Sequence, residues 1–158
     1  MACYPSVNTP SIERLPQWDE RLRNYVEETK EVPRVWGQTD CALWSIGAVD
    51  TMCGTDLAGR YVGLWDSPAT AGAYLQANGW RTLLDPVVEL VGPVLEAGAL
   101  HVALGDLVYV PTDDGLGGLG VLYGRVILPH HDKAGFRTVF LEAALRVGGC
   151  VVPIGDRR

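Results

Sequence analysis

The chain has 158 residues, of which 47% are hydrophobic and 20% are charged, and its formal net charge is −6. This length and composition are typical of one globular domain and exclude a disordered chain. The acidic balance and the scattered basic residues argue against a nucleic-acid-binding surface. No apolar run approaches the roughly 20 residues that cross a bilayer, and the N-terminus does not resemble a signal peptide. We therefore expect no membrane span and synthesis in the cytoplasm.

The four cysteines are Cys3, Cys41, Cys53 and Cys150. They contain no C-x-x-C pair and only three histidines accompany them, so the sequence predicts no zinc site and no cofactor. Cys41 and Cys53 fall on one predicted helix, about 18 Å apart along its axis, which excludes a disulfide between them. Free thiols fit a reducing compartment.

Residues 1–15 contain two prolines and predict an irregular N-terminal arm, and residues 16–158 predict one domain. Pro16 suits the first turn of a helix. Apolar residues around Leu22 follow at helical spacing, and Pro33 prevents the helix from continuing.

A second helix is predicted from Asp40 to Met52, with Asp40 or Thr39 as its N-cap and Gly54 just beyond its end. It is apolar nearly all round, which predicts a central, buried helix. Cys41 falls in its first turn, where the positive end of the helix dipole lowers the pKa of a thiol. This position favours a nucleophile, although a free cysteine also packs as a small apolar residue.

A third helix is marked by Ser67 as N-cap, by Pro68 in its first turn and by Gly79 as its stop. The segment 81–104 stays open, because Val87–Val91 fits either a strand or a short helix.

After Leu104 the pattern changes to period two and to short apolar runs, which predict strands. The turn-rich segment 111–118 predicts a loop. We expect strands at Leu107–Val110, Leu119–Tyr123, Arg125–Leu128, Val139–Leu141 and Val151–Pro153, with one helical turn at Glu142–Val147. Helices first and antiparallel strands afterwards indicate the α+β class.

Two motifs carry a resemblance to a known family. The first is Asp40-Cys41-Ala42-Leu43-Trp44, and the second is Gly105-Asp106-Leu107-Val108, followed by the predicted strand Leu119–Gly124. Over residues 35–130 the chain resembles the NlpC-type cell-wall peptidases, which are papain-like cysteine hydrolases. The resemblance implies helices packed on a small antiparallel sheet, with Cys41 in the nucleophile position.

The chain more closely resembles a degenerate branch of that superfamily found in tailed-phage and gene-transfer-agent tail modules. The matching residues are Pro16, Trp18, Arg21, Leu22 and Tyr25, then Trp36, Gly37 and Asp40–Trp44. This resemblance implies a structural subunit of a tail tip or baseplate, located in the virion. Hub, distal-tail and fibre-type subunits would be its partners, contacted through the N-terminal arm, the loop 111–118 and the tail Asp156–Arg158.

The chain departs from the active peptidases at the catalytic base. In the family a histidine at the start of the strand after Gly-Asp-Leu-Val takes the thiol proton, and a polar residue on the next strand orients it. Here the aligned base position is Gly118, and the orienter position falls near His130. Because thiol catalysis needs a base within hydrogen-bond reach, we expect a catalytically inactive fold.

Two alternatives remain. The chain could be an active cysteine endopeptidase or amidase that cleaves peptidoglycan stem peptides during DNA entry, with Cys41 as nucleophile and His130 as a displaced base. It could also be a binding module that holds an acyl chain or a peptide in the old cleft. A deep apolar pocket beside Cys41 would favour the binding module. Asp113 and Asp114 are interpreted as turn residues rather than calcium ligands.

Overall fold

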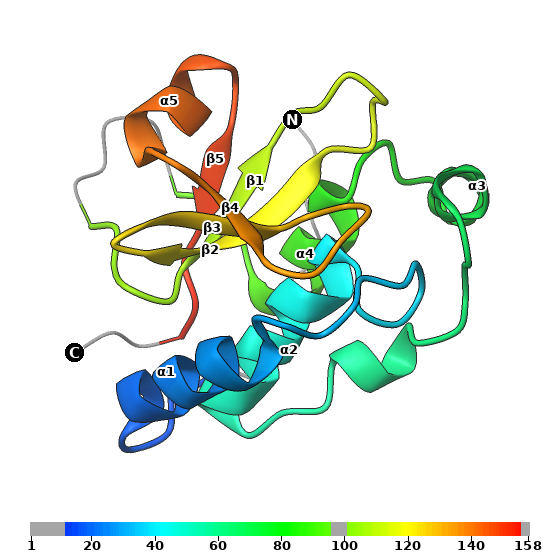
Figure 1. The fold of residues 1–158 in the computed structure, drawn as a ribbon. Helices are drawn as coiled ribbons and strands as arrows, with labels where there is room; N and C mark the ends of the chain where they lie inside the picture. Colours follow the sequence, from blue (N-terminus) through cyan, green and yellow to red (C-terminus); the bar gives the residue numbers. More distant parts are fainter. Residues whose placement is uncertain (1–11, 96–100, 156–158) are drawn as a thin grey trace.

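The structure, a computed structural model, describes residues 12–95 and 101–155 of the chain. Its helices are α1 (Trp18–Thr29), α2 (Cys41–Cys53), the short 3-10 helix η1 (Ala58–Arg60), α3 (Pro68–Ala77), α4 (Leu84–Val91) and α5 (Leu141–Arg146). Its strands are β1 (Leu107–Val110), β2 (Gly118–Tyr123), β3 (Arg125–Pro129), β4 (Phe136–Val139) and β5 (Cys150–Val152). The predicted α+β class, with Cys41 at the start of a helix, is confirmed (Figure 1). Most of the predicted arm, part of segment 81–104 and the tail Asp156–Arg158 lie outside the described residues.

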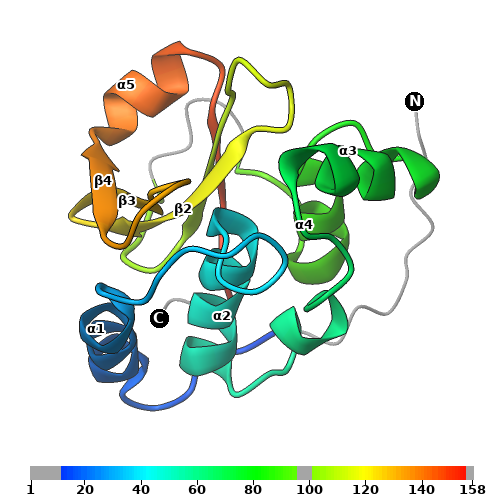
Figure 2. The ribbon, with the colours of Figure 1, turned by 45° about the vertical axis from the view of Figure 1, so that its right-hand side comes forward.

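The five strands form one antiparallel sheet in the order β4-β3-β2-β1-β5. One face carries Leu107 and Leu119 and shares a core with α1 and α2. The opposite face carries Val108 and Leu128 and packs against α5. Figure 2 shows α2 in front of the sheet, with α3 and α4 beside it. This layering places the start of α2 next to the start of β2.

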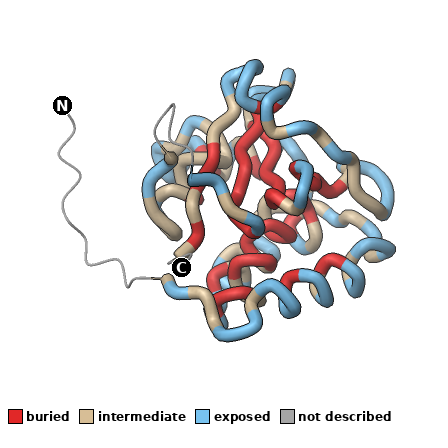
Figure 3. Tube along the Cα trace, turned by 90° about the vertical axis from the view of Figure 1, so that its left-hand side faces the viewer, coloured by how far each residue is buried: buried red, intermediate tan, exposed pale blue. Residues whose placement is uncertain are grey.

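Helix α2 is the centre of the fold. Met52, Val49 and Ala48 are fully buried in it, and buried residues run through α2 and the central strands (Figure 3). The helix ends at Gly54, whose φ of 69° lies in the left-handed region that glycine tolerates best. The predicted buried helix and its stop are confirmed.

The peripheral helices α3 and α4 correspond to the third predicted helix and to the ambiguous segment 81–104. In α3 the Ser67 side chain accepts a hydrogen bond from the Thr70 N–H in a capping box, and Pro68 occupies the first turn as predicted. The ambiguous run Val87–Val91 is helical and forms most of α4. None of the helices in residues 12–95 and 101–155 is long and apolar enough to cross a membrane.

The predicted strand Val139–Leu141 is wrong in its extent. Strand β4 begins earlier, at Phe136, which lies opposite Pro129, and it ends at Val139. Phe140 keeps an extended backbone as the N-cap of α5, and Leu141 is already helical. The short apolar run therefore spans a strand end and a helix start, so its alternation does not belong to one element.

A buried ion pair connects the segment before α1 with the start of β1. The Nη2 of Arg14 donates to Oδ1 of Asp106 at 3.0 Å, and both side chains are at most 1% exposed. Arg14 also donates to the carbonyl oxygens of Ile154 and Leu104, while Asp106 accepts from the N–H groups of Ile154 and Ala103. The aspartate of the Gly-Asp-Leu-Val motif therefore holds the entry to β1 against the segments before α1 and after β5.

Replacing Asp106 with Asn should destabilise the protein by about 3–5 kcal/mol, because it leaves the Arg14 charge buried without its partner. Urea unfolding measures this difference. The matched control is Glu27→Gln, which breaks the exposed pair between Glu27 and Lys30 and should leave the unfolding midpoint unchanged. Equal effects of the two substitutions would contradict the structural role of the buried pair.

Candidate functional site at the start of helix α2

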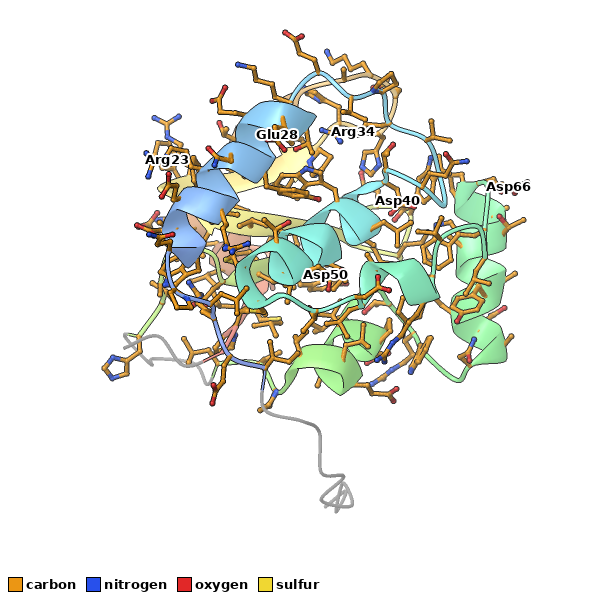
Figure 4. The ribbon with its side chains drawn as sticks, turned by 90° about the horizontal axis from the view of Figure 1, so that it is seen from below. Arg23, Glu28, Arg34, Asp40, Asp50 and Asp66 are labelled. Carbon is orange, nitrogen blue, oxygen red and sulfur yellow. The ribbon has the colours of Figure 1, made fainter. Side chains whose placement is uncertain are left out.

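The Asp40 carboxylate organises the start of α2. Its Oδ1 accepts from the Leu43 N–H at 3.0 Å, which caps the helix. Its Oδ2 accepts from the Gly37 N–H and from Nε1 of Trp65, both at 2.8 Å. Asp40 is 7% exposed, so three donors satisfy a carboxylate that is almost completely buried. Figure 4 shows Asp40 at the beginning of α2.

Gly37 is required where the loop before α2 meets the segment before α3. Its φ is 80°, and a Cβ built on it would lie 1.8 Å from the carbonyl oxygen of Trp65. Its own carbonyl oxygen accepts from the Gly63 N–H at 2.8 Å. The residues Gly37 and Asp40 of the W-G-x-x-D-C motif thus build the loop that begins the helix.

Cys41 is the first residue of α2 and is 7% exposed. The pKa of its thiol is raised to about 11, chiefly by burial and to a smaller extent by the neighbouring Asp40 charge. Hydrogen bonds from the backbone of Leu119 and Ala42 and the charge of Arg137 lower it, but burial outweighs them. The activation expected from the helix dipole is therefore not realised.

The other described thiols behave in the same way. Burial raises the pKa of Cys53 to about 11 and also raises the pKa of Cys150. Cys41, Cys53 and Cys150 are all free, and burial is the largest influence on each. Cys41 is therefore not singled out as a nucleophile by its electrostatics.

Gly118 starts β2 but faces away from Cys41. A Cβ built on it would lie 3.4 Å from Leu128 and 3.8 Å from Arg137, and Gly118 pairs with Val110. Leu128 and Val110 belong to the core on the far side of the sheet from α2. Because side chains alternate along a strand, a histidine at Gly118 would point away from the thiol. Leu119 is the residue of this strand start that faces α2.

The histidines lie in the loop after β3. His130 is half-buried, and its N–H donates to the carbonyl oxygen of Gly135 at 3.1 Å. The exposed His131 stacks on Trp36, with 6.2 Å between the ring centroids. Among the described residues, the groups that shift the pKa of the Cys41 thiol include neither histidine. The described hydrogen bonds and ring contacts of the two histidines involve Gly135 and Trp36.

The loop 111–118 folds back on the chain's own helices. The carbonyl oxygen of Leu116 accepts from the Leu83 N–H at 3.0 Å, and the Leu116 side chain approaches Gly72 of α3. Within the loop, Asp114 accepts from Thr112 and from the Leu116 N–H. In the part of the chain that the structure describes, no three His, Cys, Asp or Glu side chains converge on a metal position.

An apolar cavity of about 40 Å³ lies beside α2. Its lining includes Ala42 and Leu43, which follow Cys41 in the sequence. Its aromatic wall consists of Tyr61, Trp65, Tyr74 and Trp80, whose rings contact one another in series. Binding sites for small molecules usually enclose about 300–1,000 Å³. The cavity is too small for an acyl chain or a peptide, which removes the support that a deep pocket would give to the binding-module alternative.

The fold and this site define an α+β domain with a buried cysteine at the N-terminus of its central helix. The carboxylate of Asp40 holds the loop that precedes this cysteine. The family model described as "Domain of unknown function (DUF6950)" matches residues 13–147, and the chain belongs to this family. No curated protein and no solved structure matches the chain. Sequence reasoning found Asp40 and Cys41 but missed Trp65, which is 25 residues from Asp40 and carries no local signal for their hydrogen bond.

Replacing Asp40 with Ala should lower the free energy of unfolding by about 2–4 kcal/mol, because the helix loses its cap and two buried donors lose their acceptor. Trp65→Phe, which removes only one of the three donors, should cost less. Chemical unfolding of both variants measures the order. A smaller decrease in the free energy of unfolding for Asp40→Ala than for Trp65→Phe would contradict the organising role of Asp40.

Alkylation of Cys41 by iodoacetamide should show an apparent pKa near 11, in a variant whose other three cysteines are alanine. A matched variant that retains only Cys53 should give a similar value. Because the folded pKa lies above the unfolded value of about 8.5, the stability from the buried thiol is complete below pH 8.5 and declines as the pH rises toward 11. An apparent pKa well below 8.5 for Cys41 alone would show an activated thiol.

Proposed function

We propose that this protein is a structural subunit of a phage or gene-transfer-agent tail tip or baseplate, with a degenerate NlpC-like, papain-like fold that no longer hydrolyses peptides. The observation that carries the proposal is the state of Cys41. The residue keeps the nucleophile position of the resembled peptidases, but its thiol is buried and its pKa is raised to about 11. The chain keeps the Asp-Cys motif of the resembled peptidases although the thiol is not activated. This combination fits a fold that is used for assembly rather than for hydrolysis.

The small ionised fraction of the Cys41 thiol is evidence against catalysis. The thiolate is the nucleophile, and a thiol with a pKa of about 11 is ionised in about one molecule in ten thousand at pH 7. A neighbouring base would have to compensate for this. Gly118 faces the other side of the sheet, and the described contacts of His130 do not include Cys41.

An exposed apolar surface supports a role in assembly. We call it the α5 patch, and it consists of Val102, Leu104, Phe140 and Leu141, which line one hollow beside the turn between β2 and β3. Val102 and Leu104 are each 39% exposed, and Phe140 is 58% exposed. Contiguous apolar surface of this kind marks contact sites for other proteins. Hub, distal-tail or fibre-type subunits are the partners that the resemblance implies, in the virion after synthesis in the host cytoplasm.

The alternative is the active peptidase, with Cys41 as nucleophile and His130 as base. Incubation of the protein with purified peptidoglycan separates the two. Release of muropeptides by the wild-type protein but not by Cys41→Ala would support the peptidase. Equal lack of release by both is the result that the structural proposal predicts.

Phe140→Asp should weaken co-assembly with tail subunits at least tenfold without destabilising the fold. Phe140 is the N-cap of α5 and makes no capping bond, whereas aspartate is a favourable N-cap residue. The matched control is Val62→Asp, which is 52% exposed and lies outside the α5 patch. Sedimentation of tail particles with each variant measures incorporation. Incorporation of Phe140→Asp equal to that of Val62→Asp would contradict the proposed contact surface.

A further inference from the structure

An open hollow of about 510 Å³ lies between α3 and the loop 111–118. The polar residues of its lining are Gln76, Arg81 and Asp114, and Trp80 contributes the aromatic part. Its volume falls within the roughly 300–1,000 Å³ that is usual for small-molecule sites. The hollow lies outside the candidate site at the start of α2, and it has the size and the mixed lining of a second site.

Contacts between the loop and the helices hold the walls of this hollow in place. The Leu83 N–H donates to the carbonyl oxygen of Leu116 at 3.0 Å. The Leu116 side chain lies 3.4 Å from the position where Gly72 of α3 would carry a Cβ. The Trp80 N–H donates to the carbonyl oxygen of Leu75 at 2.9 Å, which joins Trp80 to the end of α3. The folded chain therefore forms the hollow without help from a ligand.

Asp114 supplies a negative charge on the loop side of the hollow. It accepts hydrogen bonds from the Thr112 hydroxyl and, at 2.9 Å, from the Leu116 N–H. Burial alone would raise the pKa of this carboxyl. Hydrogen bonds from the loop outweigh burial, with a smaller contribution from the charge of His131, and they hold the pKa of Asp114 below its usual value. Asp114 is therefore ionised at neutral pH, and the loop sets its orientation.

Arg81 supplies the opposite charge. Its backbone N–H donates to Oδ2 of Asp85 at 2.7 Å, whereas none of the described hydrogen bonds engages its guanidinium. Among residues 12–95 and 101–155, no ion pair joins Arg81 to Asp114. Two opposite charges thus line one hollow without pairing with each other. A ligand that carries both an anionic and a cationic group can pair with both of them.

We propose that this hollow binds a free amino acid in its zwitterionic form. The ligand's carboxylate accepts from the Arg81 guanidinium, whose planar fork matches a carboxylate. Its ammonium group donates to Asp114, because a carboxylate has acceptor positions beyond those that the loop occupies. Its apolar side chain lies against Trp80. The ligand has no net charge, so the protein's net charge of −6 does not oppose its approach.

This site goes beyond the proposed role in assembly, and nuclear magnetic resonance tests it on the isolated protein. L-leucine is the probe, titrated at neutral pH and constant ionic strength. We expect saturable shifts of the Trp80 indole N–H signal and of the Gly115 amide signal. Isocaproate lacks the ammonium group of leucine, and isoamylamine lacks its carboxylate. Each should bind at least about tenfold more weakly, because one charge-assisted hydrogen bond is lost.

Arg81→Gln should lower the affinity for leucine at least about tenfold for the same reason. Arg81 is exposed, so this substitution should leave the fold unchanged. The matched control is Arg23→Gln, which removes an exposed arginine from α1 and should bind leucine as the wild type does. The amide spectrum of each variant shows whether its fold is retained.

Absence of saturable shifts with leucine in the wild-type protein would overturn the site, and this result does not depend on any variant. Binding of isocaproate or isoamylamine as tightly as leucine would overturn the assignment of a zwitterion. An equal loss of affinity in Arg81→Gln and Arg23→Gln would also overturn the site, because the response would then be a general effect of charge.

Discussion

The buried carboxylate of Asp40 is the constraint on which the functional end of the molecule depends. It caps α2 through the Leu43 N–H, closes the preceding loop through the Gly37 N–H and holds Trp65 through its indole nitrogen. Because α2 is the central helix, fixing its first turn also fixes where Cys41 meets the start of β2. A buried charge is tolerated here because three donors compensate its desolvation, and removing it would leave each of those donors unsatisfied.

This constraint explains why a cysteine in a favourable place for catalysis behaves as a packing residue. The helix N-terminus and the backbone of Leu119 and Ala42 stabilise a thiolate, but the structure buries the thiol and places a negative charge next to it. Burial is the largest of these effects, and it gives Cys53 a pKa close to that of Cys41. The Asp-Cys motif is therefore explained by the architecture of the helix start. The Gly-Asp motif is likewise explained by the buried pair between Asp106 and Arg14.

The elements that could be predicted are those whose signals are local. The cap and stop of α2, the Ser67-Pro68 start of α3 and the strands around the turn at Gly124 follow from capping chemistry and alternation. The boundary at Phe140 could not be predicted, because one short apolar run serves a strand end and a helix start.

The site was predictable to the same local extent. The positions of Asp40 and Cys41 follow from the sequence of the helix start, whereas the partner of Asp40 at Trp65 depends on a contact between distant segments. The face to which Gly118 points depends on the register between β1 and β2, and a shift of one residue reverses it.

Exchange of Cys41 for alanine, in the tail assembly proposed above, separates packing from catalysis at this position. If Cys41 only packs, particles with the alanine variant should assemble and deliver DNA as the wild type does. Particles that assemble normally but fail to deliver DNA would contradict the packing role, because only a reactive thiol would then be missing.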